Sequence, residues 1–125
     1  MKKIIALCSV TLIVTGLWIY HKTKTPMLYG EFTGAPKANV IDLIREPKKH
    51  AGKTWAIDGI ITDQCTTMGC FFYLKADGKA LRVDLEEIAM WAPKGRNGKP
   101  VRAEGQMVPR GDGYQFWASA VEFKQ

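Results

Sequence analysis

Apolar and polar residues alternate along most of the chain after Thr54. In the first such segment, Trp55, Ile57 and Ile61 share one phase, and Asp58 lies in the other. A period of two residues is typical of strands that bury one face. The alternation therefore predicts five strands, at Thr54–Asp63, Phe71–Lys75, Leu81–Leu85, Val101–Val108 and Tyr114–Phe123.

Short helical segments and a tight turn separate these strands. Asn39 is a favourable helix N-cap, and the apolar residues after it predict a short helix that ends before Pro47. Residues Glu86–Trp91 are predicted to form a helical turn, which Pro93 stops. Asp77-Gly78, between the second and third strands, is the strongest hairpin signal in the sequence.

The order of these elements matches a known small barrel. Gly59 and Gly105 lie inside the first and fourth strands, where glycine marks a bulge or a tight bend. The predicted helical turn falls between the third and fourth strands. Five strands in this order are typical of the OB-fold, a five-stranded Greek-key barrel. We therefore predict a mainly β protein, a five-stranded OB-fold-like barrel with short helices.

The first part of the chain has a different composition. Residues Ile4–Tyr20 form an almost unbroken apolar run without a charged residue, close to the roughly 17–25 residues that span a bilayer. No small residues follow it at the spacing that signal peptidase requires. We therefore expect an uncleaved transmembrane signal anchor at residues 1–22. Residues 23–38, rich in glycine, proline and threonine, are a predicted linker or arm, and residues 39–125 the OB-like domain.

The anchor sets the expected location. Its short basic end should stay inside, which predicts a single-pass protein of the cytoplasmic (inner) membrane with its soluble domain in the periplasm or outside. Four of the 18 basic residues flank the anchor, which leaves 14 against 12 acidic residues, or about +2 for the soluble part. This small charge argues against nucleic acid as the partner. The densest basic loop, with Lys94 and Arg96, is either a solvated loop or a binding surface.

Cys65-Thr66-Thr67-Met68-Gly69-Cys70 is the chemically unusual stretch, and it lies between the first two predicted strands. If these strands form a hairpin, Cys65 and Cys70 lie close enough for a structural disulfide. In reduced form, Cys65, Met68 and Cys70 offer the soft sulfur ligands that suit Cu(I). Thiol redox chemistry is a third hypothesis, although the spacing of the two cysteines is not Cys-x-x-Cys. The sequence alone does not decide between the disulfide, Cu(I) binding and thiol redox chemistry.

Other functional signatures are weak. The sequence has no Gly-x-Ser-x-Gly, His-Glu-x-x-His or Walker motif, so we expect no enzyme activity. Phe71 and Tyr73 share a phase of the second strand that can face outward, as in barrels that stack single-stranded nucleic acid. The alternative is that these two aromatic residues pack against the arm or a membrane partner.

The chain also resembles a group of small, mostly uncharacterised bacterial exported OB-like domains. The matching residues, between Asn39 and Phe123, are Gly52-Lys53, Cys65, Gly69-Cys70-Phe71-Phe72, Ala92-Pro93 and Gly98-Lys99. It is more distantly similar to the haem chaperone of cytochrome c maturation, an anchored periplasmic OB barrel. That family attaches haem through a histidine after the last strand, whereas this chain ends Glu122-Phe123-Lys124-Gln125.

Together these observations predict an anchored, extracytoplasmic OB-like accessory domain. Its cysteine-containing turn would handle a soft metal such as Cu(I), or act as a dithiol or disulfide, in envelope or respiratory-complex assembly. A membrane protein complex is then the expected partner. The alternatives are a binding module or structural subunit with a purely structural Cys65–Cys70 disulfide, and a module that binds single-stranded nucleic acid.

Overall fold

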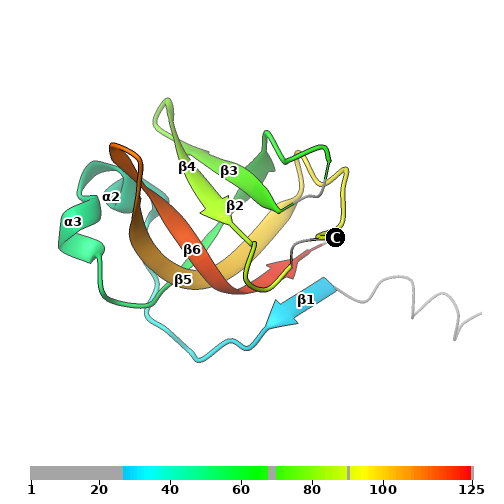
Figure 1. Cartoon of the computed structure of the whole chain (residues 1–125), viewed down its shortest axis with the longest axis horizontal. Helices are drawn as coiled ribbons and strands as arrows, with labels where there is room; N and C mark the ends of the chain where they lie inside the picture. Colours follow the sequence, from blue (N-terminus) through cyan, green and yellow to red (C-terminus); the bar gives the residue numbers. More distant parts are fainter. Residues whose placement is uncertain (1–26, 68–69, 90, 125) are drawn as a thin grey trace, which may run out of the picture.

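The chain folds into a small closed β-barrel (Figure 1). The computed structural model describes residues 27–67, 70–89 and 91–124. The elements, in chain order, are β1 (Met27–Gly30), α2 (Val40–Arg45), α3 (Pro47–His50), β2 (Trp55–Thr62), β3 (Phe71–Ala76), β4 (Lys79–Asp84), β5 (Pro100–Arg110) and β6 (Gly113–Phe123).

Five strands close the barrel in the order β6-β4-β3-β2-β5, because β5 also pairs with β6. β4 and β6 run parallel, with Val83 opposite Phe116 and Asp84 opposite Trp117. The other ladders are antiparallel. A five-stranded barrel with this strand order is an OB-like arrangement. The mainly β, OB-like barrel predicted from the sequence is therefore confirmed.

The residues on the inward-facing side of each strand pack together into one hydrophobic core. Ile57 and Ile61 of β2 are fully buried, whereas the intervening Ile60 is 52% exposed. Burying a side chain of this size contributes roughly 1.5–3 kcal/mol, so the alternation also determines which face turns inward. The largest fully buried side chains are Leu43, Ile57, Ile61, Phe72, Leu74, Val83, Leu85, Val101, Phe116, Val121 and Phe123.

Glycine allows close approach of the backbone at the predicted kink in β5. The register between β5 and β6 shifts between Glu104 and Gly105, which is the signature of a bulge. A Cβ atom on Gly105 would lie 2.2 Å from the carbonyl oxygen of Trp117, so no other residue fits without movement of the backbone. Gly59 instead faces Leu74, whose side chain would lie 3.0 Å from an added Cβ. Its pairing with β5 is regular.

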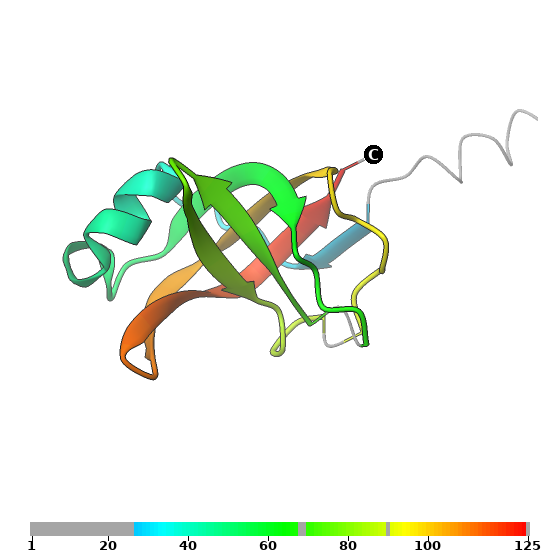
Figure 2. The same cartoon turned by 90° about the horizontal axis from the view of Figure 1, so that it is seen from above.

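Different segments lie at the two ends of the barrel (Figures 1 and 2). At one end, α2 and α3 lie next to the β3–β4 turn, where Arg45 donates to Asp77 at 2.6 Å. The other end is formed by residues 63–67, 70, 85–89 and 91–99, and we call it the thiol end. β1 begins at the thiol end, because Met27 pairs with Phe123, the last residue of β6.

Residues 27–38 run along the outside of the barrel. β1 adds to β6 as a sixth strand. Beyond it, the ring of Phe32 lies 4.1 Å from the guanidinium carbon of Arg102. Lys37 forms a parallel bridge with Ala56 of β2. The arm expected from the sequence is thus attached at several points along residues 27–38, and Met27–Gly30 form a strand.

The predicted strands agree with the observed ones to within a few residues, and three local features differ. No pattern in the sequence predicts β1, or α3, which begins at Pro47 directly after α2. The predicted helical turn is present as a single turn, in which Ala89 donates its N–H to the carbonyl oxygen of Leu85 at 2.7 Å. Asn39 lies at the N-cap of α2 as predicted, but its side chain makes no capping hydrogen bond.

The predicted anchor, residues 1–22, lies outside the described residues. Within the part of the chain that the structure describes, no helix is long and apolar enough to cross a membrane.

Candidate functional site

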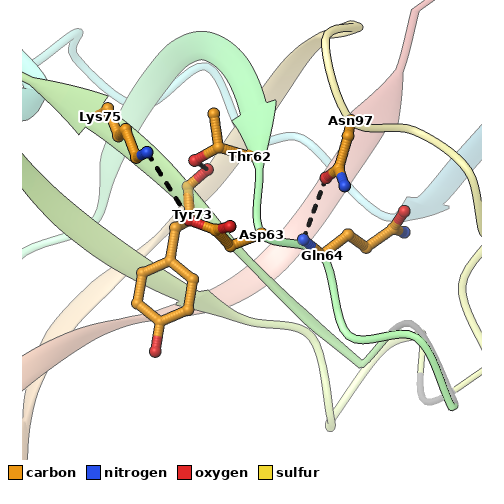
Figure 3. A network of polar contacts seen from close by, with 6 residues as sticks. All are labelled: Thr62, Asp63, Gln64, Tyr73, Lys75 and Asn97. Atoms are coloured by element: carbon orange, nitrogen blue, oxygen red, sulfur yellow. Dashed lines mark hydrogen bonds and ion pairs between the residues drawn. The ribbon is translucent and has the colours of Figure 1, made fainter.

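The loop that carries the cysteines begins where the β2–β3 ladder ends (Figure 3). The last pair of this ladder is Thr62 and Tyr73, and the Thr62 hydroxyl also donates to the carbonyl oxygen of Tyr73 at 3.1 Å. Asp63 then adopts φ 47°, in the left-handed region, which takes the chain out of the ladder. Its carboxylate lies 3.8 Å from Lys75. The loop therefore starts at a defined bend.

Backbone hydrogen bonds hold both cysteines. The N–H of Cys65 donates to the carbonyl oxygen of Phe71 at 3.0 Å. The carbonyl oxygen of Cys70 accepts from the N–H of Leu85 at 2.7 Å. Cys65 is thus tied to β3, and Cys70 to the end of β4.

Gln64, the residue before Cys65, joins this loop to the β4–β5 loop. It is 7% exposed. Its backbone N–H donates to Asn97 Oδ1 at 3.0 Å, as Figure 3 shows. Its side-chain amide donates to the carbonyl oxygen of Pro93 at 2.6 Å and accepts from the N–H of Arg96 at 3.0 Å. One buried side chain therefore fixes the relative position of the two loops.

The two thiols lie in contact. Both cysteines are half-buried, and their side chains share a hydrogen bond. Burial raises the pKa of the Cys70 thiol, and the hydrogen bond to Cys65 and the charge of that sulfur raise it further. Asp84 adds a smaller effect in the same direction. Cys65 Sγ also lies 3.2 Å from the hydroxyl of Thr67.

This arrangement offers two adjacent soft sulfur atoms. Within residues 27–67, 70–89 and 91–124, no group of three or more His, Cys, Asp or Glu side chains is placed to hold a metal ion. Structural zinc, which takes four such ligands, does not fit the described residues. Thiolate sulfur is a preferred ligand of Cu(I). Met68, the predicted third ligand, lies outside the described residues.

The aromatic residues predicted as a binding surface lie on the outside of β3. Phe71 and Tyr73 are half-buried, with ring centroids 6.1 Å apart in an edge-to-face arrangement. The guanidinium of Arg82 lies 3.8 Å from the centroid of the Phe71 ring and donates to Gln115 at 3.2 Å. A stacking base would have to displace Arg82 from Phe71. The predicted aromatic surface is therefore partly occupied by the protein's own cation–π contact.

The two basic residues of the predicted surface lie elsewhere, on the β4–β5 loop, and differ in exposure. Lys94 is exposed. Arg96 is half-buried, with its guanidinium 5.8 Å from the centroid of the Phe123 ring and 3.4 Å from the carbonyl oxygen of Lys124. Lys94 therefore faces solvent, whereas Arg96 also packs against the barrel.

Sequence reasoning missed two buried polar residues, Gln64, which positions the cysteine loop, and Glu104, which fastens the arm. Gln64 lies beside the cysteines, but its role depends on a loop about 30 residues away. Glu104 is 2% exposed, and its carboxylate accepts hydrogen bonds from the backbone and hydroxyl of Thr33 and from the N–H groups of Gly34 and Ala35. The only sequence signal for Glu104 was a charged residue inside a strand pattern.

Comparison with known proteins supports the fold alone. No family model matches the sequence, and no curated protein matches it. Among solved structures, the chain is similar to the hypothetical protein YgiW from E. coli, a small barrel of OB-like kind. The TM-score is 0.51 at 11% sequence identity, over 75% of this chain and 98% of that chain. This likeness agrees with the barrel described above.

Proposed function

We propose that this protein is a membrane-anchored, extracytoplasmic OB-like accessory domain whose Cys65 and Cys70 thiols bind a soft metal, Cu(I), during envelope or respiratory-complex assembly. The observation that carries the proposal is the contact between the two thiols. Backbone bonds to β3 and to Leu85 hold the cysteines in place. Such a preorganised pair of sulfur ligands needs little rearrangement when it binds a metal.

The same contact supports a second candidate, a disulfide between Cys65 and Cys70. A loop this short removes little chain entropy, so the bond would stabilise the fold by only about 2 kcal/mol. A structural bond is therefore a modest benefit for the two cysteines. The two candidates differ in the redox state of the sulfurs in the native compartment.

Anaerobic titration of the reduced full-length protein with Cu(I), against a competing chromophoric chelator, tests the metal proposal. We expect one Cu(I) per chain, and a loss of affinity of about tenfold or more in C65S and in C70S, because each removes a thiolate ligand worth at least 1.4 kcal/mol. C8S is the matched control, since Cys8 belongs to the predicted anchor. M68L tests the predicted third ligand.

Two results decide against metal binding. A C65S/C70S double variant that binds Cu(I) as tightly as the parent would exclude the pair as ligands. Thiol counting on protein taken directly from its native membrane separates the candidates further. Full protection of Cys65 and Cys70 from alkylation until a reductant is added would favour the structural disulfide.

A further inference from the structure

The thiol end exposes a tryptophan beside basic residues. Trp91, on the β4–β5 loop, is 72% exposed, the largest value among the large apolar residues that the structure describes as exposed. Lys94 and Lys99 are exposed on the same loop. The sequence contains no acidic residue between Glu87 and Glu104. The exposed Glu86 and Glu87 lie at the start of this loop, so the aromatic side chain and the positive charge occur together in residues 91–99.

Hydrogen bonds hold the loop in place on both sides of Trp91. On one side, Ala89 donates to the carbonyl oxygen of Leu85 at 2.7 Å. On the other, the carbonyl oxygen of Pro93 accepts from Gln64 at 2.6 Å. Because the barrel core is complete without the Trp91 side chain, its exposure is not explained by folding.

The start of β1 brings further apolar surface to this end. Met27 is 42% exposed and Leu28 58%. Met27 pairs with Phe123, and the Arg96 guanidinium of the β4–β5 loop packs over the Phe123 ring at 5.8 Å. Figures 1 and 2 both show the start of β1 and the β4–β5 loop at the same end of the barrel. Three of the four large exposed apolar residues in the described part of the chain thus belong to β1 or this loop.

The connection to the predicted anchor limits how far this end can lie from a membrane. Only residues 23–26 separate the anchor, residues 1–22, from Met27. Four residues span at most about 14 Å when fully extended. If the anchor crosses the bilayer, the thiol end is therefore the end of the barrel nearest the membrane surface.

We propose that the thiol end rests on the surface of an anionic bilayer, with Trp91 in the interface and Lys94 and Lys99 against lipid phosphates. Tryptophan favours this region because its ring is apolar and its N–H is polar. Lysine extends its charged group to the headgroups while its stem covers apolar surface. The inference rests on the anchor in the proposed function and is independent of metal binding. It would place Cys65 and Cys70 next to the membrane.

Quenching by brominated lipids tests the contact in the full-length chain, reconstituted in vesicles of phosphatidylcholine and phosphatidylglycerol. All variants carry W18F, because Trp18 in the predicted anchor would itself be quenched, and W117F, because the Trp117 indole N–H donates to Glu87 at the thiol end. We expect brominated lipids to quench the emission of the remaining tryptophans. Most of this quenching should disappear when W91F is added. W55F is the matched control, because Trp55 lies at the other end, where its indole N–H donates to His50. Adding W55F should leave the lipid-quenched emission in place.

A charge variant and flotation complete the test. K94Q/K99Q should weaken quenching of Trp91 in vesicles with phosphatidylglycerol more than in pure phosphatidylcholine. If the chain floats with the vesicles but W91F leaves the quenched emission unchanged, the surface contact is wrong and the anchor stands. Trp91 would then be available to a protein partner instead. If the chain does not float, both the anchor and the surface contact are wrong, and the Cu(I) titration still judges the thiol site separately.

Discussion

At the scale of single residues, Glu104 is the clearest case of a charge that the fold uses. It lies on β5, faces outward, and is covered by the arm. Burial opposes the charged form of Glu104, but the hydrogen bonds from Thr33, Ala35 and Gly34 outweigh this and lower its pKa below the ordinary value of 4.5. The ionised carboxylate therefore fastens the arm to the barrel more strongly than the protonated carboxyl group would.

Replacing Glu104 with glutamine should destabilise the protein at neutral pH by about 2 kcal/mol, because hydrogen bonds to a charged acceptor are lost and an amide N–H₂ faces backbone donors. The folded pKa is lowered, so this stabilisation is complete above 4.5, the ordinary value, and declines as the pH falls below it through the folded pKa. Urea unfolding of E104Q and parent across this range measures the difference. The difference in unfolding free energy between parent and E104Q should become smaller in acid.

Glu31 provides the control for this prediction, since it is an exposed acidic residue on the same arm. E31Q should unfold at nearly the parent urea concentration at neutral pH. A parent–E104Q difference that stays constant from neutral pH to well below 4.5 would contradict the role given to the Glu104 charge.

At this scale the sequence indicated which residues are chemically unusual, but not which residues they contact in the fold. The cysteines were recognised from residue type alone, and their position in the turn between β2 and β3 was predicted correctly. Gln64 carries no local signal, and Glu104 only that of a charge inside a strand pattern. Their partners Pro93 and Thr33 become neighbours only in the folded chain.

At the scale of elements, the β4–β5 loop has almost no regular structure. Gln64 holds its middle, and backbone bonds to Ile61 hold Gly98 and Lys99 at its end. Q64A should destabilise the protein by roughly 2 kcal/mol, because the carbonyl oxygen of Pro93 and the N–H of Arg96 lose their partner. Hydrogen exchange should accelerate in residues 93–99 more than in the barrel strands. Q106A is the control, since Gln106 is exposed on β5. Equal protection of this loop in Q64A and parent would show that other contacts hold it.

Strong periodicity explains which elements were predicted. β2 buries Ile57 and Ile61 on one face, and the Asp77-Gly78 turn has positive φ at both residues, 53° and 74°, as its sequence suggests. β1 spans only four residues and is mostly exposed, so it has no apolar period of its own. Its pairing with β6 decides its conformation. The sequence of residues 27–30 is typical of a linker and does not indicate this pairing.

At the scale of the whole molecule, β6 joins the barrel to the entering chain. It pairs with β5 along its length, with β4 near its start, and with β1 near its end. The barrel is closed without β1, because β5 and β6 complete the ring. β1 therefore sets where the chain reaches the barrel more than whether the barrel forms.

Gly30, the last residue of β1, allows this separation to be tested. It has φ 72°, and a Cβ atom there would lie 2.1 Å from the carbonyl oxygen of Ser119. G30A should release β1 from β6, because the overlap adds to the roughly 1–2 kcal/mol cost of alanine in the left-handed region. Hydrogen exchange measured by mass spectrometry should then show rapid exchange in residues 27–30, while β5 and β2 keep their protection.

G98A separates the two causes in this prediction. Gly98 also has a positive φ, 82°, but nothing lies within 4 Å of an added Cβ. G98A should therefore show only the conformational cost of alanine at a positive φ, and β1 should remain protected from hydrogen exchange. If G30A leaves β1 as protected as in the parent, the close approach to Ser119 does not govern docking. If G30A instead removes protection from all strands together, β1 is an integral part of the barrel, and the entering chain and the barrel fold as one unit.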